Sequence, residues 1–192
     1  MKNVVILGAG GNIAKHVIDI LAKQDDVHLT LFLRSALKLK SKDVSKCRLI
    51  EGDVMNANQL KEAITGQDIV YANLSGNMEP MAKNIVNVMD EAGVKKLIFI
   101  SSIGIYDIPL KVNLKPYRKA ADIIEASDLE YTILRPTWFT YGNDVDYEIT
   151  KKGEPEKGSV ISQKSLAAFI SKIIESPENY VRENLGVNKP NS

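Results

Sequence analysis

Two kinds of apolar pattern take turns along this chain, and together they predict alternating strands and helices. The first kind is a short unbroken apolar run such as Val4 to Leu7, which is typical of a parallel strand buried on both faces. Further strands are predicted at residues 28–33, 47–51, 68–73, 96–101 and 130–135, with a final one near 184–188. The second kind, apolar residues at helical spacing, lies between these runs.

The helical pattern is clearest in three stretches, which we interpret as core-facing stripes. They are Ile13, Val17, Ile20 and Leu21; Met81, Ile85, Val88 and Met89; and Leu166, Phe169, Ile170, Ile173 and Ile174. Strands and helices in alternation predict a doubly wound Rossmann-type α/β fold, in which helices cover both faces of one parallel sheet. The 192 residues fit a single domain, 1–192. Between residues 137 and 162 the pattern breaks into a polar stretch, which we interpret as an excursion over the substrate side.

The turn after the first apolar run has the composition of a phosphate-binding loop. Gly8 can turn sharply off the strand, Gly11 can bring its backbone close to a pyrophosphate, and Ala14 lets the next helix pack on the sheet. The N–H groups and the dipole of that helix favour negative charge at its N-terminus. The spacing G-x-x-G-x-x-A is looser than G-x-G-x-x-G, and a tight structural connection is the alternative. Because the turn joins a strand to a helix, we expect it to bind a dinucleotide. The residues concerned are Gly8, Gly10, Gly11, Asn12 and Ile13.

The end of the second predicted strand indicates which dinucleotide to expect. NAD-specific sites place an acidic side chain there, about 20 residues beyond the glycine turn, to bind the ribose 2′-hydroxyl. This chain has Arg34 instead, and no Asp or Glu occurs between Asp26 and Asp43. A guanidinium can pair with a 2′-phosphate, so we expect NADP(H) in preference to NAD. The alternative is that Arg34 only solvates the end of a strand.

Composition narrows the possible partners and compartment. A net charge of +1 with 26% charged residues provides no basic field for nucleic acid. No apolar run approaches the roughly 18 residues of a membrane helix, so no membrane span is expected. Cys47, the only cysteine, lies in a predicted strand, where we expect it in the core; an internal disulfide is impossible, and the cytoplasm is the expected compartment. His16 and His28 are far apart in the sequence, and no metal site is expected.

Several short segments taken together resemble the atypical short-chain dehydrogenase/reductases, and most closely their NmrA-like, NAD(P)H-binding group. They are Gly8-x-x-Gly11-x-x-Ala14, Arg34, Gly52-Asp53-Val54, Ser101-Ser102 and Tyr131-Thr132-Ile133-Leu134-Arg135-Pro136. The resemblance covers almost the whole chain. It implies that Asp53 lies beside the adenine; a turn or capping aspartate is the alternative. The residues Asn73, Leu74, Ser75 and Gly76 lie where the fourth predicted strand ends, at the edge where this architecture binds ligands, so we expect them to line the cofactor groove; Ser75 and Gly76 can equally be turn residues. The remaining cofactor contacts that the resemblance implies are Val54, Ser101 and Pro136.

Catalytic members of the wider superfamily use a serine or threonine after the fifth strand and a Tyr-x-x-x-Lys pair on the next helix. Ser102 resembles that serine, although Ser101 and Ser102 can also simply end a strand. Tyr117 resembles the tyrosine, but Ala121 holds the lysine position. Lys119 lies about 200° around a helix from Tyr117 and cannot substitute. Tyr106 is an alternative proton donor.

Three functions are compatible with these observations. The first is an NADP(H)-dependent oxidoreductase that reduces a small carbonyl, quinone-like or flavin-like acceptor, with Ser102 orienting the acceptor. The second is a non-catalytic sensor of the NADPH/NADP⁺ ratio that acts through a protein partner, and the missing lysine favours it. A nucleotide-sugar epimerase or dehydratase fits less well, because such enzymes depend on that lysine and on a larger C-terminal region. Oligomeric state is open.

Overall fold

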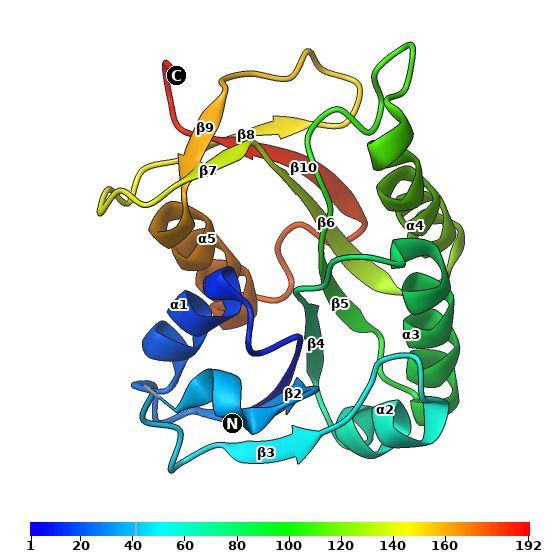
Figure 1. The fold of residues 1–192 in the computed structure, drawn as a ribbon, viewed down its shortest axis with the longest axis vertical. Coiled ribbons are helices and arrows are strands. Elements are labelled where there is room, and N and C mark those ends of the chain that lie inside the picture. Colours follow the sequence, from blue (N-terminus) through cyan, green and yellow to red (C-terminus); the bar gives the residue numbers. More distant parts are fainter. Residues whose placement is uncertain (41) are drawn as a thin grey trace.

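The computed structural model describes residues 1–40 and 42–192, and eight of the ten strands in this part of the chain form one sheet. Seven of its strands are β1 (Lys2–Leu7), β2 (Val27–Leu33), β3 (Arg48–Glu51), β4 (Ile69–Ala72), β5 (Lys96–Ile100), β6 (Glu130–Pro136) and β10 (Glu183–Asn188). The eighth is β8 (Glu148–Lys151), and the order across the sheet is β3-β2-β1-β4-β5-β6-β10-β8 (Figure 1). Neighbouring strands are parallel except β8, which pairs antiparallel with β10. The predicted doubly wound single domain is confirmed.

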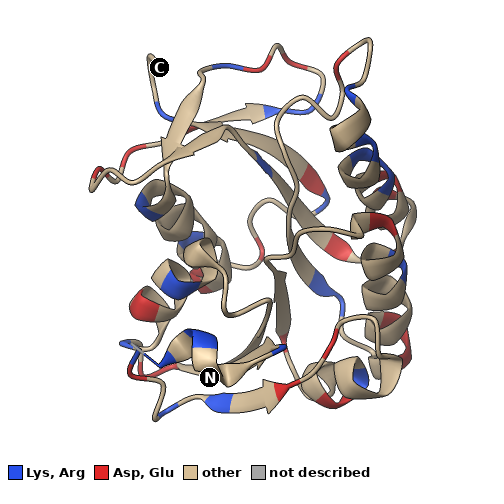
Figure 2. Cartoon of the chain, viewed as in Figure 1, with Lys and Arg blue, Asp and Glu red and all other residues tan. Residues whose placement is uncertain are grey.

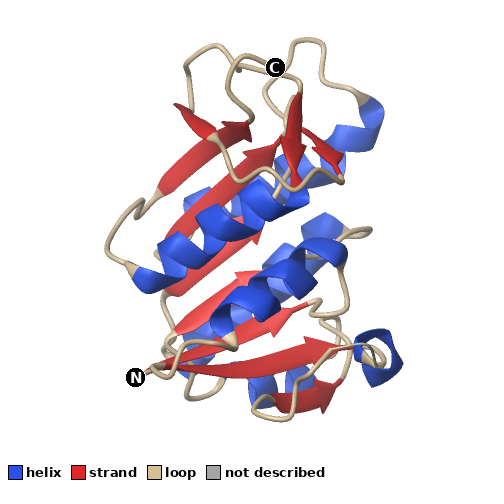
Figure 3. Cartoon of the chain, turned by 90° about the vertical axis from the view of Figure 1, so that its left-hand side faces the viewer, coloured by secondary structure: helices blue, strands red, loops and turns tan. Residues whose placement is uncertain are grey.

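Helices cover both faces of the sheet. On one face lie α1 (Asn12–Leu21) and α5 (Gln163–Glu175); on the other lie α2 (Ala57–Ile64), α3 (Met78–Ala92) and α4 (Lys115–Ala126). Figure 3, seen from the side of α1 and α5, shows helices in front of the strands and behind them. Two short 3₁₀ turns, η1 (Ala36–Leu39) and η2 (Val112–Leu114), complete the helical elements.

The first strand shows why an unbroken apolar run is needed. Val4 and Ile6 belong to the core on the α1–α5 face, whereas Val5 and Leu7 belong to the core under α2, α3 and α4. All four side chains are fully buried. A strand in the middle of a two-faced sheet has no polar side, so the four buried residues from Val4 to Leu7 are all apolar. Figure 2 accordingly shows the charged residues mostly on helices and loops.

The excursion at residues 137–162 is more regular than predicted. It contains β7 (Trp138–Thr140) and β9 (Val160–Ser162), which form a small parallel sheet, and it also supplies β8 to the main sheet. These strands are only three or four residues long, too short for a periodic pattern to reveal. The aromatic side chains of Trp138 and Tyr141, which belong to this excursion, are 76% and 86% exposed, so they lie on the surface and not in the core.

One core prediction is wrong. Strand β3 begins at Arg48, so Cys47 lies just before it, and the cysteine is only half-buried. The reason is that β3 is an edge strand with a single strand neighbour, and its Leu49 is exposed as well. Within the part of the chain that the structure describes, no helix is long and apolar enough to cross a membrane.

Candidate functional site

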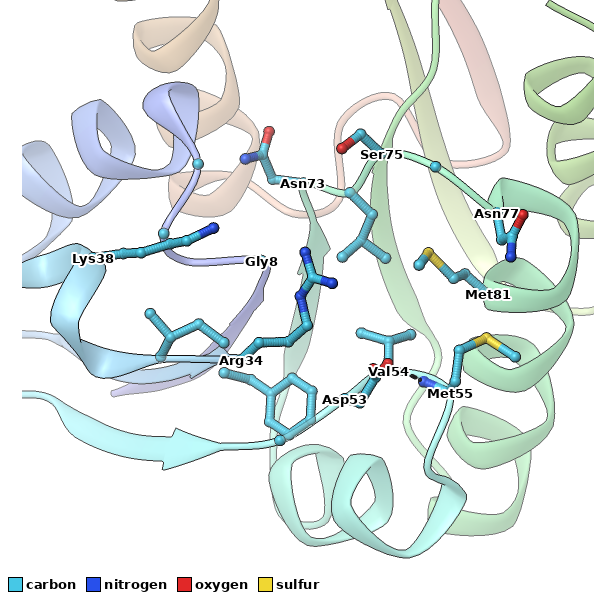
Figure 4. Close-up of a pocket in the computed structure, with 17 residues that line it drawn as sticks. Gly8, Arg34, Lys38, Asp53, Val54, Met55, Asn73, Ser75, Asn77 and Met81 are labelled. Carbon is cyan, nitrogen blue, oxygen red and sulfur yellow. Dashed lines mark hydrogen bonds between the residues drawn. The ribbon is translucent and has the colours of Figure 1, made fainter.

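A cavity of about 540 Å³ lies at the carboxyl ends of β1, β2, β3 and β4. Strand order reverses direction between β1 and β4, and doubly wound folds bind their ligands at such a switch point. Figure 4 shows the cavity between the β1–α1 turn and the first turn of α3. Its wall consists of Gly8, Gly10, Gly11, Phe32, Leu33, Arg34, Lys38, Gly52, Asp53, Val54, Met55, Asn73, Leu74, Ser75, Gly76, Asn77 and Met81.

The glycine turn packs directly against the loop that follows β4. A Cβ on Gly8 would lie 2.2 Å from the carbonyl oxygen of Asn73, and Gly8 also has a φ of +79°. A Cβ on Gly11 would lie 2.3 Å from Nδ2 of Asn73. Gly8 is therefore required by the packing of the protein itself, whereas a side chain at Gly11 would have to displace the Asn73 amide; this packing leaves the backbone of the turn bare along one side of the cavity.

The N-terminus of α1 opens beside this turn without a side-chain cap. Gly11 is the N-cap residue, no side chain accepts from the first turn, and no acidic residue occurs there. The first N–H groups of a helix have no partner within it, and together with the helix dipole they favour an anion. Asn12 and Ile13, which were predicted cofactor contacts, are the first two residues of α1 and are not part of the cavity wall. The arrangement fits a pyrophosphate.

Two cationic side chains extend into the cavity at the carboxyl end of β2. Arg34 follows β2 directly, and Lys38 lies on η1 with its aliphatic stem over Gly10, whose Cβ would lie 2.8 Å from Cδ of Lys38. Figure 4 shows both side chains reaching into the space between the glycine turn and Asp53. Neither cation has a side-chain hydrogen bond or ion pair with any described residue. The nearby carboxylate of Glu51 instead accepts from the backbone N–H of Ala36, at 2.6 Å.

The opposite end of the cavity is mainly apolar, with Asp53 and Asn77 as polar residues. This part of the wall includes Val54, Met55 and Met81. The Asp53 carboxylate accepts from the backbone N–H of Met55 at 2.9 Å, as an aspartate in a turn does. It lines the cavity as well, so its turn role and its place beside a ligand are compatible. A mainly apolar wall with one carboxylate suits a purine ring.

The predicted contacts further along the sheet edge lie outside this cavity. Ser101 follows β5, is 5% exposed, and has a hydroxyl without a partner among the described residues. Pro136 ends β6 and is buried. Ser102 is half-buried, and its hydroxyl donates to the carbonyl of Ile103 at 3.2 Å. Because β4, β5 and β6 are parallel neighbours, these residues continue the same edge of the sheet beyond Ser75.

Tyr117 lies in the first turn of α4, half-buried against the core under α2, α3 and α4. Ala121, one helical turn later, is fully buried, and its methyl group has no polar chemistry. Lys119 points elsewhere, because its ammonium donates to Glu79 of α3 at 3.0 Å. Lys119 therefore does not take the place of the lysine that is missing from the Tyr-x-x-x-Lys pair.

Tyr106 is held in a polar network. Its hydroxyl donates to Glu125 at 3.1 Å and accepts from Nδ2 of Asn184 at 2.7 Å. Burial, followed by the charge of Glu125, raises the pKa of Tyr106. Cations lie over its ring at 4.5 Å (Arg118), 4.9 Å (Lys152) and 5.3 Å (Arg135). With both hydrogen-bonding directions occupied, Tyr106 contributes to packing here, and its role as a proton donor stays a prediction.

The structure brings nine of the thirteen predicted cofactor contacts into one cavity wall. They are Gly8, Gly10, Gly11, Arg34, Asp53, Val54, Asn73, Leu74 and Ser75. Gly76, expected on the same edge, lines the cavity as well. Sequence reasoning assigned no such contact to the other seven wall residues, which are Phe32, Leu33, Lys38, Gly52, Met55, Asn77 and Met81. Met81 was interpreted only as core, because its apolar spacing along α3 gives no signal that separates the cavity wall from the core. Among the described residues no three His, Cys, Asp or Glu side chains are grouped as metal ligands.

Comparisons with known proteins agree with this geometry. A family model described as NAD(P)H-binding matches residues 8–177. A solved Rossmann-fold NAD(P)-binding family protein from Shigella flexneri is 49% identical with a TM-score of 0.93, covering 100% of this chain and 95% of that one. A short-chain dehydrogenase/reductase from Veillonella parvula, solved in complex with NADP, is 25% identical with a TM-score of 0.88, covering 99% and 95%.

The curated relatives are more distant. An isoflavone reductase homolog from Nicotiana glauca is 29% identical over 152 residues, which cover 72% of this chain and 49% of the relative. The chain thus matches about half the length of that protein.

Proposed function

Because this chain belongs to the NAD(P)H-binding family, we propose that it is an NADP(H)-dependent oxidoreductase that reduces a small carbonyl, quinone-like or flavin-like acceptor. The glycine turn and the N-terminus of α1 would hold the pyrophosphate, and the apolar wall with Asp53 would hold the adenine. Binding of NAD(P)H follows from the family. The preference for NADP(H), the reductase chemistry and the acceptor class are the proposal.

One observation carries the cofactor preference: two cations, Arg34 and Lys38, line the cavity where NAD-specific sites carry a carboxylate. Both side chains are solvent-exposed and lack ion-pair partners among the described residues, so neither must break a contact to meet a phosphate. A planar guanidinium matches a phosphate in two parallel hydrogen bonds, and the Lys38 ammonium adds a second positive charge. The NADP-bound relative from Veillonella parvula supports this preference.

The carboxyl ends of β5 and β6 would receive the acceptor. Bound NADPH supplies a hydride. Ser102 would donate a hydrogen bond to the acceptor oxygen or ring nitrogen, which requires its hydroxyl to turn away from the Ile103 carbonyl. A solvent water or Tyr117 would supply the proton. Reduction tolerates the missing lysine better than oxidation does, because a neutral tyrosine or water serves as the acid. The reductase name of the Nicotiana relative agrees with this direction.

The first experiment is a titration of the purified protein with NADPH and with NADH, followed by cofactor fluorescence. We expect tighter binding of NADPH. A charged hydrogen bond contributes roughly 1.5–3 kcal/mol, so Arg34→Ala should weaken NADPH binding about 10- to 150-fold and leave NADH nearly unchanged. Equal losses for both dinucleotides would remove Arg34 from the 2′-phosphate site.

Turnover is tested separately, by NADPH consumption with a panel of carbonyls, quinones and flavins. Activity with one acceptor class would establish the reductase. Tight NADPH binding without turnover across the panel would contradict it.

The second candidate is a redox sensor that binds NADP(H) without catalysis and acts through a protein partner. The observation that favours it is the buried Ala121 at the lysine position, with Lys119 paired to Glu79 instead. A sensor requires a partner with different affinities for the NADPH-bound and NADP⁺-bound forms, since no population shifts without differential binding. Pull-down in the presence of each dinucleotide, followed by titration of any partner, measures that difference; identical affinities would contradict the sensor.

A further inference from the structure

A carboxylate from the excursion connects two segments that are far apart in the sequence. Glu156 lies in the connection between β8 and β9. From residue 151 to residue 159, all residues are exposed except Glu156, which is partly buried. Its Oε1 accepts from Nε of Arg135 at 2.7 Å, and its Oε2 accepts from the backbone N–H of Gly104 at 3.1 Å. The Glu156 side chain is 23% exposed, so this exposed connection is anchored through one inward-pointing residue.

The stronger of these two contacts of Glu156 is its ion pair with Arg135. The guanidinium, on β6, is 1% exposed, and Glu156 is its only carboxylate partner among the described residues. Gly186, opposite it on β10, leaves room for the side chain, and Nη1 donates to the carbonyl of Asn184 at 2.8 Å. A buried charge without a counter-charge is strongly unfavourable, so Arg135 holds Glu156 in place.

The Gly104 contact begins where regular strand pairing ends. Ser101 N–H donates to the Leu134 carbonyl at 2.7 Å, and Ile103 N–H donates to the Pro136 carbonyl at 3.1 Å, so β5 and β6 remain paired beyond β5. Gly104 then leaves this pairing with a φ of +80°. Its N–H donates to Glu156 and thereby fixes the next peptide of the loop.

We propose that Glu156 is a positioning residue for Ser102. By accepting from both Arg135 and Gly104, its carboxylate fastens the excursion across the segment 101–104 and holds the Ser102 hydroxyl at the carboxyl edge of β5. The inference rests on the proposed function, in which Ser102 orients the acceptor. It adds a residue that touches neither cofactor nor acceptor and acts through the loop.

Two substitutions test this role from different sides. Glu156→Gln keeps the shape but has a single acceptor oxygen, and its NH₂ group would face an N–H donor. Glu156→Asp keeps the charge beside Arg135, but its side chain is one methylene shorter and cannot span both donors. If the glutamine variant does not fold, the aspartate variant decides. Glu154→Gln is the matched control, because Glu154 is exposed on the same connection and accepts only from the local Lys151 N–H.

Three measurements on the full-length protein distinguish positioning from plain stabilisation. Hydrogen exchange should become about tenfold faster for residues 102–107 in both Glu156 variants and stay unchanged in the control. NADPH affinity should stay within twofold, since no residue of the excursion lines the cofactor cavity. Below the unfolding transition, kcat for the acceptor should fall about tenfold, which corresponds to about 1.4 kcal/mol of activation free energy.

Unchanged exchange at 102–107 would overturn the proposal, as would faster exchange with an unchanged kcat. If the wild-type protein turns over no acceptor, the proposed function fails by itself. In that case the hydrogen-exchange rates of residues 102–107 alone test whether Glu156 holds the Ser102 loop in place.

Discussion

The two halves of the carboxyl edge of this sheet are built in different ways. At the ends of β1 to β4 the edge is an open cavity of glycine backbone, apolar side chains and two cations without ion-pair partners among the described residues. At the ends of β5 and β6 it is covered by the excursion and carries the Arg135–Glu156 ion pair, and the Lys152–Glu125 pair lies beside Asn184 on the adjoining face of β10. The first half has its charge available for a ligand, whereas the second uses its charge to hold segments of the protein together.

The difference follows from what covers each half. Leu185 and Val187 of β10 pack into the α1–α5 core, so Asn184, Gly186 and Asn188 face the other side, beyond the layer of α2, α3 and α4. Over this part of the sheet lie Glu125 of α4, which accepts from Nδ2 of Asn184 at 2.8 Å, and polar side chains of the excursion. Polar groups buried under a loop must be paired, which explains the network around Tyr106 and Arg135.

The largest loss of unfolding free energy should come from adding a side chain to the glycine turn at Gly8. Gly8→Ala would place a methyl group 2.2 Å from a backbone carbonyl, whereas Gly66 shares the same positive φ (+77°) but has open space around it. Strain and overpacking together predict a loss of about 3–5 kcal/mol of unfolding free energy for Gly8→Ala, and the strain alone about 1 kcal/mol for Gly66→Ala. Urea unfolding of both variants measures the two losses, and NADPH binding should disappear only with the first. If the two variants lost similar amounts of unfolding free energy, the backbone of the turn would have to shift to accommodate the methyl group at position 8.

The next effect concerns the other half. Arg135→Met should lower the unfolding free energy by about 2–3 kcal/mol, less than for a fully buried pair because water can reach the Glu156 carboxylate that loses its partner. Adding Glu156→Gln to this variant should cost less than Glu156→Gln alone, since the two residues interact directly. NADPH affinity should stay within twofold. A large loss of affinity would mean that the two halves are not independent.

The cofactor half could largely be predicted from the sequence because its determinants lie close together in the chain. The Gly8–Gly11 turn, Arg34 at the end of β2, and Asn73 to Ser75 at the end of β4 each follow a strand directly. In a parallel sheet all such ends meet at one edge, so predicting the strands also predicts the wall of the cavity. Met55 and Met81 were missed because their apolar side chains give no signal that separates wall from core.

The acceptor half could not be predicted in the same way. Glu156 pairs with Gly104 across 52 positions of sequence, and Asn184 bonds Tyr106 across 78. In the sequence, a glutamate in a polar, glycine-containing stretch cannot be distinguished from a solvent-exposed residue. Its contact with Arg135 exists only in the folded protein. The resemblance likewise identified Arg135 only as part of a strand motif, and its burial and its partner follow from tertiary contacts.

A smaller effect would sharpen the assignment of the two cations. Lys38→Ala should weaken NADPH binding about fivefold, the loss expected for one exposed charge interaction of about 1 kcal/mol. NADH binding should change by less than twofold. Lys40→Ala is the control, since Lys40 lies just after η1 and outside the cavity wall. If NADH binding weakens equally, Lys38 interacts with the pyrophosphate at the glycine turn and Arg34 alone selects the 2′-phosphate.

The smallest effect should be a dependence of stability on pH in the charged half. Burial alone would raise the pKa of Glu125, but hydrogen bonds from Lys152 and Asn184 outweigh burial and hold the pKa below its ordinary value. A carboxyl group with a lowered pKa in the folded protein stabilises it above the unfolded pKa of about 4.3, and this contribution is lost as the pH falls through the folded value. Lys152→Met removes the ammonium, so the folded pKa of Glu125 should rise.

The variant should therefore be less stable than the wild type by about 0.5 kcal/mol at pH 7, and the difference should shrink as the pH is lowered to 3, because protonation of Glu125 removes its attraction to Lys152. Urea unfolding at the two pH values measures it, with Lys151→Met as a control because Lys151 pairs with the different carboxylate of Glu183. A difference that persists undiminished at pH 3 would instead assign the role of Lys152 to its contact with the Tyr106 ring, 4.9 Å away, which does not depend on the charge of Glu125.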